Sequence, residues 1–408
     1  MKGKDMKSRS SIFIIAMIFF FIKYSSSQIP GYKNIEIVES VPVETQLDNP
    51  EIRNTFEVWK ELIQNAEYTI DLEQFYISNE PGEPLEDIIN LLIDASKRGV
   101  KIRIIADAGM YKTYPQTLDL LKTTPNFQVR LIDYRKILGG IQHAKYMIID
   151  NQSVFIGSQN FDWRALKHIF ELGLKIKNEQ LAKVFTDIFE VDWALSESEK
   201  ITVKPKNYDV PITIIENRDT IKLIPTFSPY SLIPDTNLFD EKNILDLINK
   251  AKNEIYFHVL TYSPVNSNKE YYAAIDNALR SAALRGVKIN IMISDWSKRK
   301  PTIYYLKSLA VIPNITVKMT TVPEYSKGFI PYARVDHRKF LIVDNNYIWL
   351  GTSNWEKSYF YKSRNLGVII ENEKLNETFK NIFLKSWNGP YSYEIKPEID
   401  YTPPKVGE

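Results

Sequence analysis

Two short segments of the chain place histidine, lysine and aspartate at the same spacing. HAKYMIID begins at His143 and HRKFLIVD begins at His337, in a chain with four histidines. Side chains two residues apart on a strand share a face, so Lys145 is expected beside His143 and Lys339 beside His337. An imidazole can attack or protonate a phosphodiester while a neighbouring ammonium group stabilises its negative charge. The pattern therefore predicts phosphodiester chemistry.

A glycine-led tetrapeptide follows each of these segments, GSQN after the first and GTSN after the second. Glycine lets a backbone approach a ligand closely, and the side chains after it can donate hydrogen bonds to phosphate oxygens. The predicted phosphate-binding residues are Ser158, Asn160, Thr352 and Asn354. If the two copies face each other, one cleft holds two imidazoles, two ammonium groups and two amides. This set predicts phosphodiester transfer with no cofactor and no metal.

The aspartates that end the two segments complete the motif at Asp150 and Asp344. Each lies seven residues after its histidine, which is about 23 Å along an extended strand. Neither can touch the histidine of its own segment. We expect both carboxylates to accept hydrogen bonds at a turn and to serve the site structurally.

The two copies differ at one position that bears on the mechanism. Glu171 follows His143 at the same distance at which Asn365 follows His337. A carboxylate bonded to Nδ1–H of an imidazole leaves Nε2 free to act as a nucleophile. We therefore predict that Glu171 supports His143 as the nucleophile and that His337 is the general acid. The alternative is that Glu171 is a helix-face or turn charge without a role in catalysis.

These residues belong to an internal repeat that covers most of the chain. In each copy the sequence indicates a strand, an amphipathic helix, a second strand, the histidine strand, a tight turn, another strand and a final helix. Alternating strands and helices are typical of the α/β class. We predict two similar α/β sandwich lobes, residues 28–200 and 201–408, with mixed, largely parallel sheets. A pseudo-twofold axis would place the active site between them.

A basic leader and an unbroken apolar run precede the first copy. Residues 1–27 are predicted to form a secretory signal peptide, or alternatively a short membrane anchor. The predicted location is the secretory pathway, either secreted or in the lysosomal or endosomal lumen. Sequons at Asn151, Asn314 and Asn376 would then be available for glycosylation. The chain contains no cysteine, so neither a disulfide nor a thiolate contributes.

Without the leader, 47 basic and 49 acidic residues leave a net charge near −2. This charge excludes a general nucleic-acid binder and requires phosphate recognition to be local. Two aromatic stretches, 226–234 and 322–334, could stack bases, sit at a lipid interface or simply pack around the cleft. His168 and His258 are expected to be structural, although Glu73 and His258 occupy matching positions that could line the cleft.

The paired His-x-Lys-x4-Asp motifs with GSQN and GTSN resemble those of the phospholipase D superfamily. The resemblance covers nearly all of the chain after the leader. It implies a two-lobed phosphodiesterase, a covalent phosphohistidine and no metal requirement. NFDWRALKHIFELG, PYARVDHRKF and IWLGTSNWEKSYF are most similar to the lumenal phospholipase D-like proteins of animal endolysosomes, some of which are 5′ exonucleases. The absence of cysteine and the short apolar leader depart from that group.

Three functions follow from these observations. The first is hydrolysis of phospholipids such as phosphatidylcholine to phosphatidic acid and a free head group, with possible peripheral membrane contact. The second is 5′ exonuclease activity on single-stranded DNA or RNA at the same site. The third is a catalytically inactive binding protein, which the intact His, Lys and Asn residues in both copies disfavour.

Overall fold

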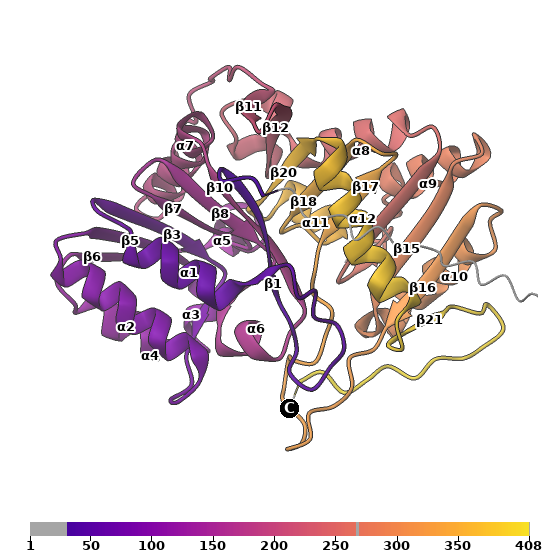
Figure 1. The fold of residues 1–408 in the computed structure, drawn as a ribbon, viewed down its shortest axis with the longest axis horizontal. Helices are drawn as coiled ribbons and strands as arrows, with labels where there is room; N and C mark the ends of the chain where they lie inside the picture. The colour runs from indigo at the N-terminus through magenta and orange to yellow at the C-terminus, as the bar shows by residue number, and fades with distance from the viewer. Residues whose placement is uncertain (1–30, 267–268, 408) are drawn as a thin grey trace, which may run out of the picture.

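The computed structural model describes residues 31–266 and 269–407. Figure 1 shows two lobes side by side, with the first copy in indigo to magenta and the second in orange to yellow. The predicted signal peptide, residues 1–27, lies outside the described residues. No helix in the described ranges is long and apolar enough to cross a membrane.

Among the described residues, the first lobe contains an eight-stranded mixed sheet. Its strands, in spatial order, are β2 (Arg53–Asn54), β1 (Ile35–Ser40), β10 (Glu171–Lys177), β8 (Ser153–Gly157), β7 (Lys145–Ile149), β3 (Thr69–Gln74), β5 (Lys101–Asp107) and β6 (Phe127–Ile132). Strands β3, β5 and β6 are parallel, whereas β7, β8, β10 and β1 pair antiparallel. Asp150 and Asn151 join β7 to β8 with φ of 52° and 53°, as a type I′ hairpin turn requires.

The second lobe repeats this arrangement in a nine-stranded sheet, counted over the described residues. Its spatial order is β11 (Ile212–Glu216), β12 (Asp219–Ser228), β20 (Asn365–Glu371), β18 (Tyr347–Gly351), β17 (Phe340–Val343), β13 (Glu254–Val259), β15 (Lys288–Ser294), β16 (Ile315–Thr320) and β21 (Ser392–Glu394). Here β13, β15 and β16 are the parallel strands. Two short parallel pairs lie apart from the large sheets: β4 (Ile77–Ser78) with β9 (Phe161–Asp162), and β14 (Tyr262–Ser263) with β19 (Trp355–Glu356).

Helices cover both faces of each sheet (Figure 1). Those of the first lobe are α1 (Thr55–Gln64), α2 (Pro84–Lys97), α3 (Ala108–Tyr111), α4 (Gln116–Lys122), α5 (Tyr134–Leu138), α6 (Trp163–Lys167) and α7 (Glu179–Leu195). Those of the second are α8 (Asp240–Lys250), α9 (Ala274–Leu284), α10 (Thr302–Ala310), α11 (Lys357–Tyr361), α12 (Glu373–Asn388) and the short 3₁₀ turns Tyr230–Leu232, Thr236–Leu238 and Asp295–Lys298. The larger apolar core continues from α7 into the second lobe, where Phe185 contacts Phe227 at 5.3 Å between ring centroids. The two lobes therefore share one core.

The α/β class, the two lobes and the mixed sheets are confirmed. The parallel part is smaller than the sequence indicated, because the strands β10 and β20 were not anticipated. ELGLKIK and NLGVIIE form these strands and add antiparallel neighbours to β8 and β18. The lobe boundary at residues 200 and 201 stays a prediction.

The three sequons differ in accessibility. Asn151 and Asn314 are exposed. Asn376 is only 1% exposed, and its side-chain nitrogen donates to the Tyr347 carbonyl at 3.0 Å. A glycan cannot be carried at Asn376 in this fold, because the nitrogen that would bear it is buried and already bonded.

Candidate active site

The two histidines lie where the lobes meet, and each is fixed by backbone from the other copy. The His143 amide donates to the Arg364 carbonyl at 2.9 Å, and the His337 amide donates to the Phe170 carbonyl at 2.8 Å. Both imidazoles line a single cavity of about 390 Å³. The predicted site between the copies is therefore present in the geometry.

The side-chain partners of the imidazoles also cross between the copies. His337 Nδ1 lies 2.9 and 3.0 Å from the two carboxylate oxygens of Glu171, and His143 Nδ1 lies 2.9 Å from Asn365 Oδ1. The prediction that Glu171 supports His143 is wrong. The physical reason is that the start of β10 lies beside the segment before β17, so Glu171 faces the histidine of the second copy.

Both motif lysines are buried beneath the histidines. Lys145 Nζ donates to the His143 carbonyl at 2.8 Å, and Lys339 Nζ donates to the His337 carbonyl at 2.6 Å. Burial lowers the pKa of Lys339 to about 7 and holds the pKa of Lys145 well below its usual value. A bound phosphate would oppose this effect, because its negative charge favours the protonated ammonium groups.

Burial favours the neutral form of both histidines. Burial, followed by the positive charges of Lys145 and Lys339, holds the pKa of both imidazoles well below the usual value. Burial raises the pKa of Glu171 to about 7, against the opposing effect of Lys339. An Nδ1–H held by Glu171 leaves Nε2 of His337 as the free basic atom. The proton on Nδ1 is inferred here from the carboxylate it faces.

The two amides of the tetrapeptides reach the cavity as predicted. Asn160 and Asn354 line it together with the histidines. Their Oδ1 atoms are buried and form no hydrogen bond within the described residues. A buried amide without a full set of partners suits a site that a polar ligand occupies.

The two hydroxyls differ from the prediction. Ser158 Oγ accepts from the Leu172 amide at 3.0 Å, and Thr352 Oγ1 donates to Asn365 Oδ1 at 3.0 Å. Neither is among the residues that line the cavity. Their bonds hold the first residues of β10 and β20, so Ser158 and Thr352 position Glu171 and Asn365 instead of facing a phosphate.

The motif aspartates have the structural role expected of them. Asp150 accepts three backbone amides, those of residues 67 to 69, at 2.7 to 2.9 Å. Asp344 accepts the equivalent amides of residues 252 to 254 at 2.8 to 3.0 Å. Each carboxylate ties the far end of the histidine strand to the start of the neighbouring strand, β3 or β13, which runs antiparallel to it.

A buried polar group behind His337 was not anticipated. Asp336 lies 3.1 Å from His258 Nε2 and accepts two bonds from Arg338 at 2.6 and 2.8 Å. In the first copy, Gln142 donates to Glu73 at 3.0 Å at the matching place. The signal available in the sequence was the charged pair flanking the histidine in DHR, which the first copy lacks.

The burial of Glu73, His258 and His168 decides whether each of them faces the cleft. Glu73 and His258 are fully buried and neither lines the cavity, so the suggestion that they face the cleft is wrong. His168 is 1% exposed and packs edge-on against Tyr325 and Trp163. Its structural role agrees with the expectation.

Aromatic side chains form much of the cavity wall. They come from both lobes and comprise Phe75, Tyr76, Tyr114, Trp296, Tyr332 and Tyr359. The stretch 322–334 contributes Tyr332, whereas 226–234 contributes no lining residue. The stretch 226–234 is instead held to the rest of the second lobe, where the Leu232 carbonyl accepts a hydrogen bond from the Arg364 guanidinium.

Two of these aromatic residues contact a motif histidine directly. The rings of Phe75 and Tyr359 lie edge-on to His143, with centroids 5.1 and 5.0 Å away. Spacing from the motif could not identify them, because they come from the segments after β3 and within α11. Over the described residues, no group of three or more acidic or histidine side chains is arranged to hold a metal ion. Independence from metals stays a prediction.

This arrangement can carry out a two-step displacement at phosphorus. One imidazole has a carboxylate at Nδ1 and the other has an amide, so their basicities differ. Two amides line the space between them, and the two motif lysines are buried beside it, each bonded to the carbonyl of its own histidine. A phosphodiester bound there would meet a nucleophile on one side and a proton donor on the other.

Comparison with known proteins finds one family model that matches the chain twice, once in each lobe. The family model described as "Cardiolipin synthase, PLD-like domain" matches residues 59–193 and 244–387. Phospholipase D Z of Dictyostelium discoideum is 30% identical over 89% of this chain and 91% of its own length. The virion nicking-joining enzyme of vaccinia virus is 31% identical over 88% of this chain and 89% of its own.

A third relative carries a different activity in its name. The 5′-3′ exonuclease PLD3 of Xenopus laevis is 30% identical over 87% of this chain and 80% of its own. Among solved structures, the phosphatidylserine synthase of Haemophilus influenzae has the same fold, with a TM-score of 0.59 at 15% identity over 84% of this chain and 85% of its own. With both motif copies matched over the two lobes, the chain belongs to the phospholipase D superfamily of phosphodiesterases.

Proposed function

We propose that the chain is a metal-independent phosphodiesterase that removes the terminal unit of single-stranded nucleic acid through a covalent phosphohistidine. The aromatic wall of the cavity carries this proposal, because aromatic faces stack bases of any sequence. A cavity of about 390 Å³ accommodates one nucleotide-sized group and not a duplex. Terminal cleavage is supported by the exonuclease named among the relatives.

The crossed partners of the histidines assign the steps. Nε2 of His337, supported by Glu171, attacks phosphorus and forms a P–N bond while the bond to the leaving oxygen breaks. His143, as the imidazolium, gives that oxygen a proton; the negative charge of the bound phosphodiester favours this protonated form and opposes the burial that lowers the pKa of His143. In the second step His143 takes a proton from water, the water oxygen bonds to phosphorus, and the P–N bond breaks to regenerate His337. This reverses the roles expected from the sequence, since the carboxylate belongs to the other histidine.

Hydrolysis of phosphatidylcholine is the second candidate. Two relatives are named phospholipase D, and an aromatic wall also suits a quaternary ammonium head group through cation–π contacts. Leu120 and Tyr332, 52% and 49% exposed, lie in the groove that continues from the cavity and could meet a lipid surface.

One parallel assay separates these candidates. The protein, with EDTA present, is given a 5′-hydroxyl single-stranded oligonucleotide and phosphatidylcholine vesicles at pH 5 and pH 7. A double variant, His143→Asn with His337→Asn, is the control. Stepwise shortening of the oligonucleotide by the unsubstituted protein alone is expected. Release of choline and phosphatidic acid alone would replace the first candidate by the second, and no product from either substrate would favour the binding-protein alternative.

A further inference from the structure

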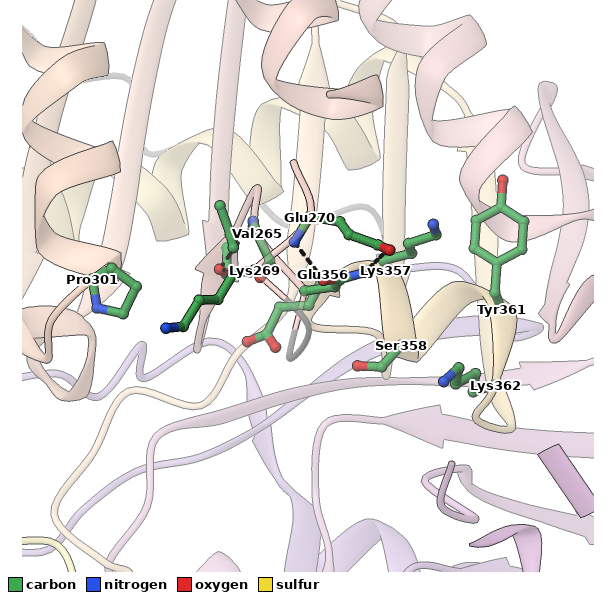
Figure 2. Close-up of a pocket in the computed structure, with 11 residues that line it drawn as sticks. Val265, Lys269, Glu270, Pro301, Glu356, Lys357, Ser358, Tyr361 and Lys362 are labelled. Carbon is green, nitrogen blue, oxygen red and sulfur yellow. Dashed lines mark hydrogen bonds between the residues drawn. The ribbon is translucent and has the colours of Figure 1, made fainter. Parts of the chain in front are cut away.

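The repeat places an equivalent hollow on each lobe beside the central cavity. Glu356, Lys357 and Ser358 stand 194 residues after Asp162, Trp163 and Arg164, the same offset that relates the two motif histidines. The second-lobe set lines a hollow of about 580 Å³, shown in Figure 2. The first-lobe set, with Asp162 beneath it, borders one of about 670 Å³. A pseudo-twofold axis between the histidines therefore has one hollow on each side.

An equivalent hydrogen bond lies beside each hollow. In the first lobe, Tyr76 donates to Asp162 at 2.7 Å; in the second, Thr261 donates to Glu356 at 2.7 Å. The first-lobe hollow shares Tyr114 and other lining residues with the cavity. In the second lobe, adjacent residues of α11 line the hollow and the central cavity: Ser358 lines the hollow, and Tyr359 lines the cavity.

The two hollows differ in chemistry. The first-lobe hollow is aromatic, with Tyr114, Trp163 and Tyr332, and its Arg164 guanidinium is held by Asp162 at 2.8 Å. The second-lobe hollow is lined by three lysines, Lys269, Lys357 and Lys362, and by two carboxylates, Glu270 and Glu356. Lys357 and Lys362 are exposed, and neither forms an ion pair within the described part of the chain.

The two lysines also lie near the junction of the lobes. Figure 2 shows Ser358 and Lys362 on the side of the hollow that faces the violet segments of the first lobe. A Cβ placed on Gly139 of the first lobe would lie 3.9 Å from Lys362 Nζ. This ammonium group is therefore beside the segment that leads into His143, and not on a remote surface.

We propose that the second-lobe hollow binds the next phosphate of the substrate chain, beyond the phosphodiester that is cleaved. A phosphodiester has two arms, and the two hollows lie on opposite sides of the histidines. The terminal nucleoside occupies the aromatic side, and the rest of the chain passes over Lys357 and Lys362. Unpaired ammonium groups suit a phosphate of the nucleic-acid backbone. This inference rests on the proposed nuclease function and specifies a substrate with at least two phosphodiesters.

The test compares a dinucleotide, which has one phosphodiester, with a trinucleotide, which has two. The unsubstituted protein should have a KM roughly tenfold lower for the trinucleotide, as a charge-assisted contact implies. The double variant Lys357→Gln with Lys362→Gln should lose this difference and leave kcat for the dinucleotide unchanged. The slope of log(kcat/KM) against log salt for the trinucleotide should fall by about 0.7, the value for one phosphate of a single strand.

A matched variant, Lys122→Gln with Lys250→Gln, removes two exposed helical lysines outside the hollow and should retain the trinucleotide preference. Two outcomes would overturn this inference and leave the proposed nuclease function standing. One is an equal KM for both substrates in the unsubstituted protein, and the other is the same loss of trinucleotide preference in both double variants. Cleavage of bis(p-nitrophenyl) phosphate without cleavage of either oligonucleotide would overturn the proposed nuclease function and this inference with it.

Discussion

Replacing Glu171 by glutamine should slow formation of the phosphohistidine more than replacing Asn365 by alanine. Both carboxylate oxygens of Glu171 lie within 3.0 Å of His337 Nδ1, whereas His143 Nδ1 has a single neutral partner. A charge-assisted bond contributes about 1.5–3 kcal/mol and a neutral one about 0.5–1.5 kcal/mol. The first step should therefore slow by about 13- to 160-fold for Glu171→Gln and by about 2- to 13-fold for Asn365→Ala.

Stopped-flow kinetics with bis(p-nitrophenyl) phosphate isolates that step, because p-nitrophenolate leaves without needing a proton. A His143→Asn variant should keep the burst of p-nitrophenolate and accumulate the intermediate, which peptide mapping should locate on His337. A His337→Asn variant should show no burst. With an alkoxide leaving group, His143→Asn should lose about 10²- to 10⁴-fold in rate. Phosphoryl label on His143, or a larger effect from Asn365→Ala, would refute the assignment.

Three further predictions concern pH and stability. kcat/KM should pass through a maximum near pH 7, because Glu171 is protonated below about 7 and Lys339 loses its charge above about 7; a flat profile from pH 5 to 9 would contradict this. Asp344→Ala should lower the free energy of unfolding in urea by about 3 kcal/mol while kcat is nearly kept, because three backbone amides lose their acceptor; lost activity at unchanged stability would show a catalytic role. Arg364→Met should lower the free energy of unfolding by about 3–5 kcal/mol, because it leaves the buried Asp192 carboxylate without its ion-pair partner. Adding Asp192→Leu should recover part of that loss. An unchanged free energy of unfolding in the single variant would disprove this prediction.

The repeat was sufficient to predict the two lobes and the meeting of the two histidines. Spacing along a strand also gave the correct role for Asp150, because distance along an extended chain depends on residue count alone. The same spacing placed Asn160 and Asn354 at the cavity. In these cases the local backbone and the pseudo-twofold decide the position, and both can be inferred from sequence.

The errors arose where contacts cross between the copies. A repeat suggests that each copy is self-contained, so Glu171 was assigned to the histidine of its own copy. The unanticipated strand β10 instead delivers Glu171 to His337, and β20 delivers Asn365 to His143. Ser158 was misassigned for a different reason: the strand β10 was not anticipated, and the Ser158 hydroxyl bonds to the Leu172 amide within the same copy. Sequence periodicity describes each lobe but not the pairing of one lobe with the other.

The exchange of backbone bonds between the copies has a consequence for how this enzyme would lose activity. The His143 and His337 amides each depend on a carbonyl from the opposite lobe. A separation of the lobes by a few ångströms would release both imidazoles while each sheet kept its own hydrogen bonds. Inactivation by heat would then precede melting of secondary structure, and neither lobe expressed alone would hold its histidine in a working position. Duplication within one chain thus makes catalysis a property of the junction, which mutation of either half can abolish.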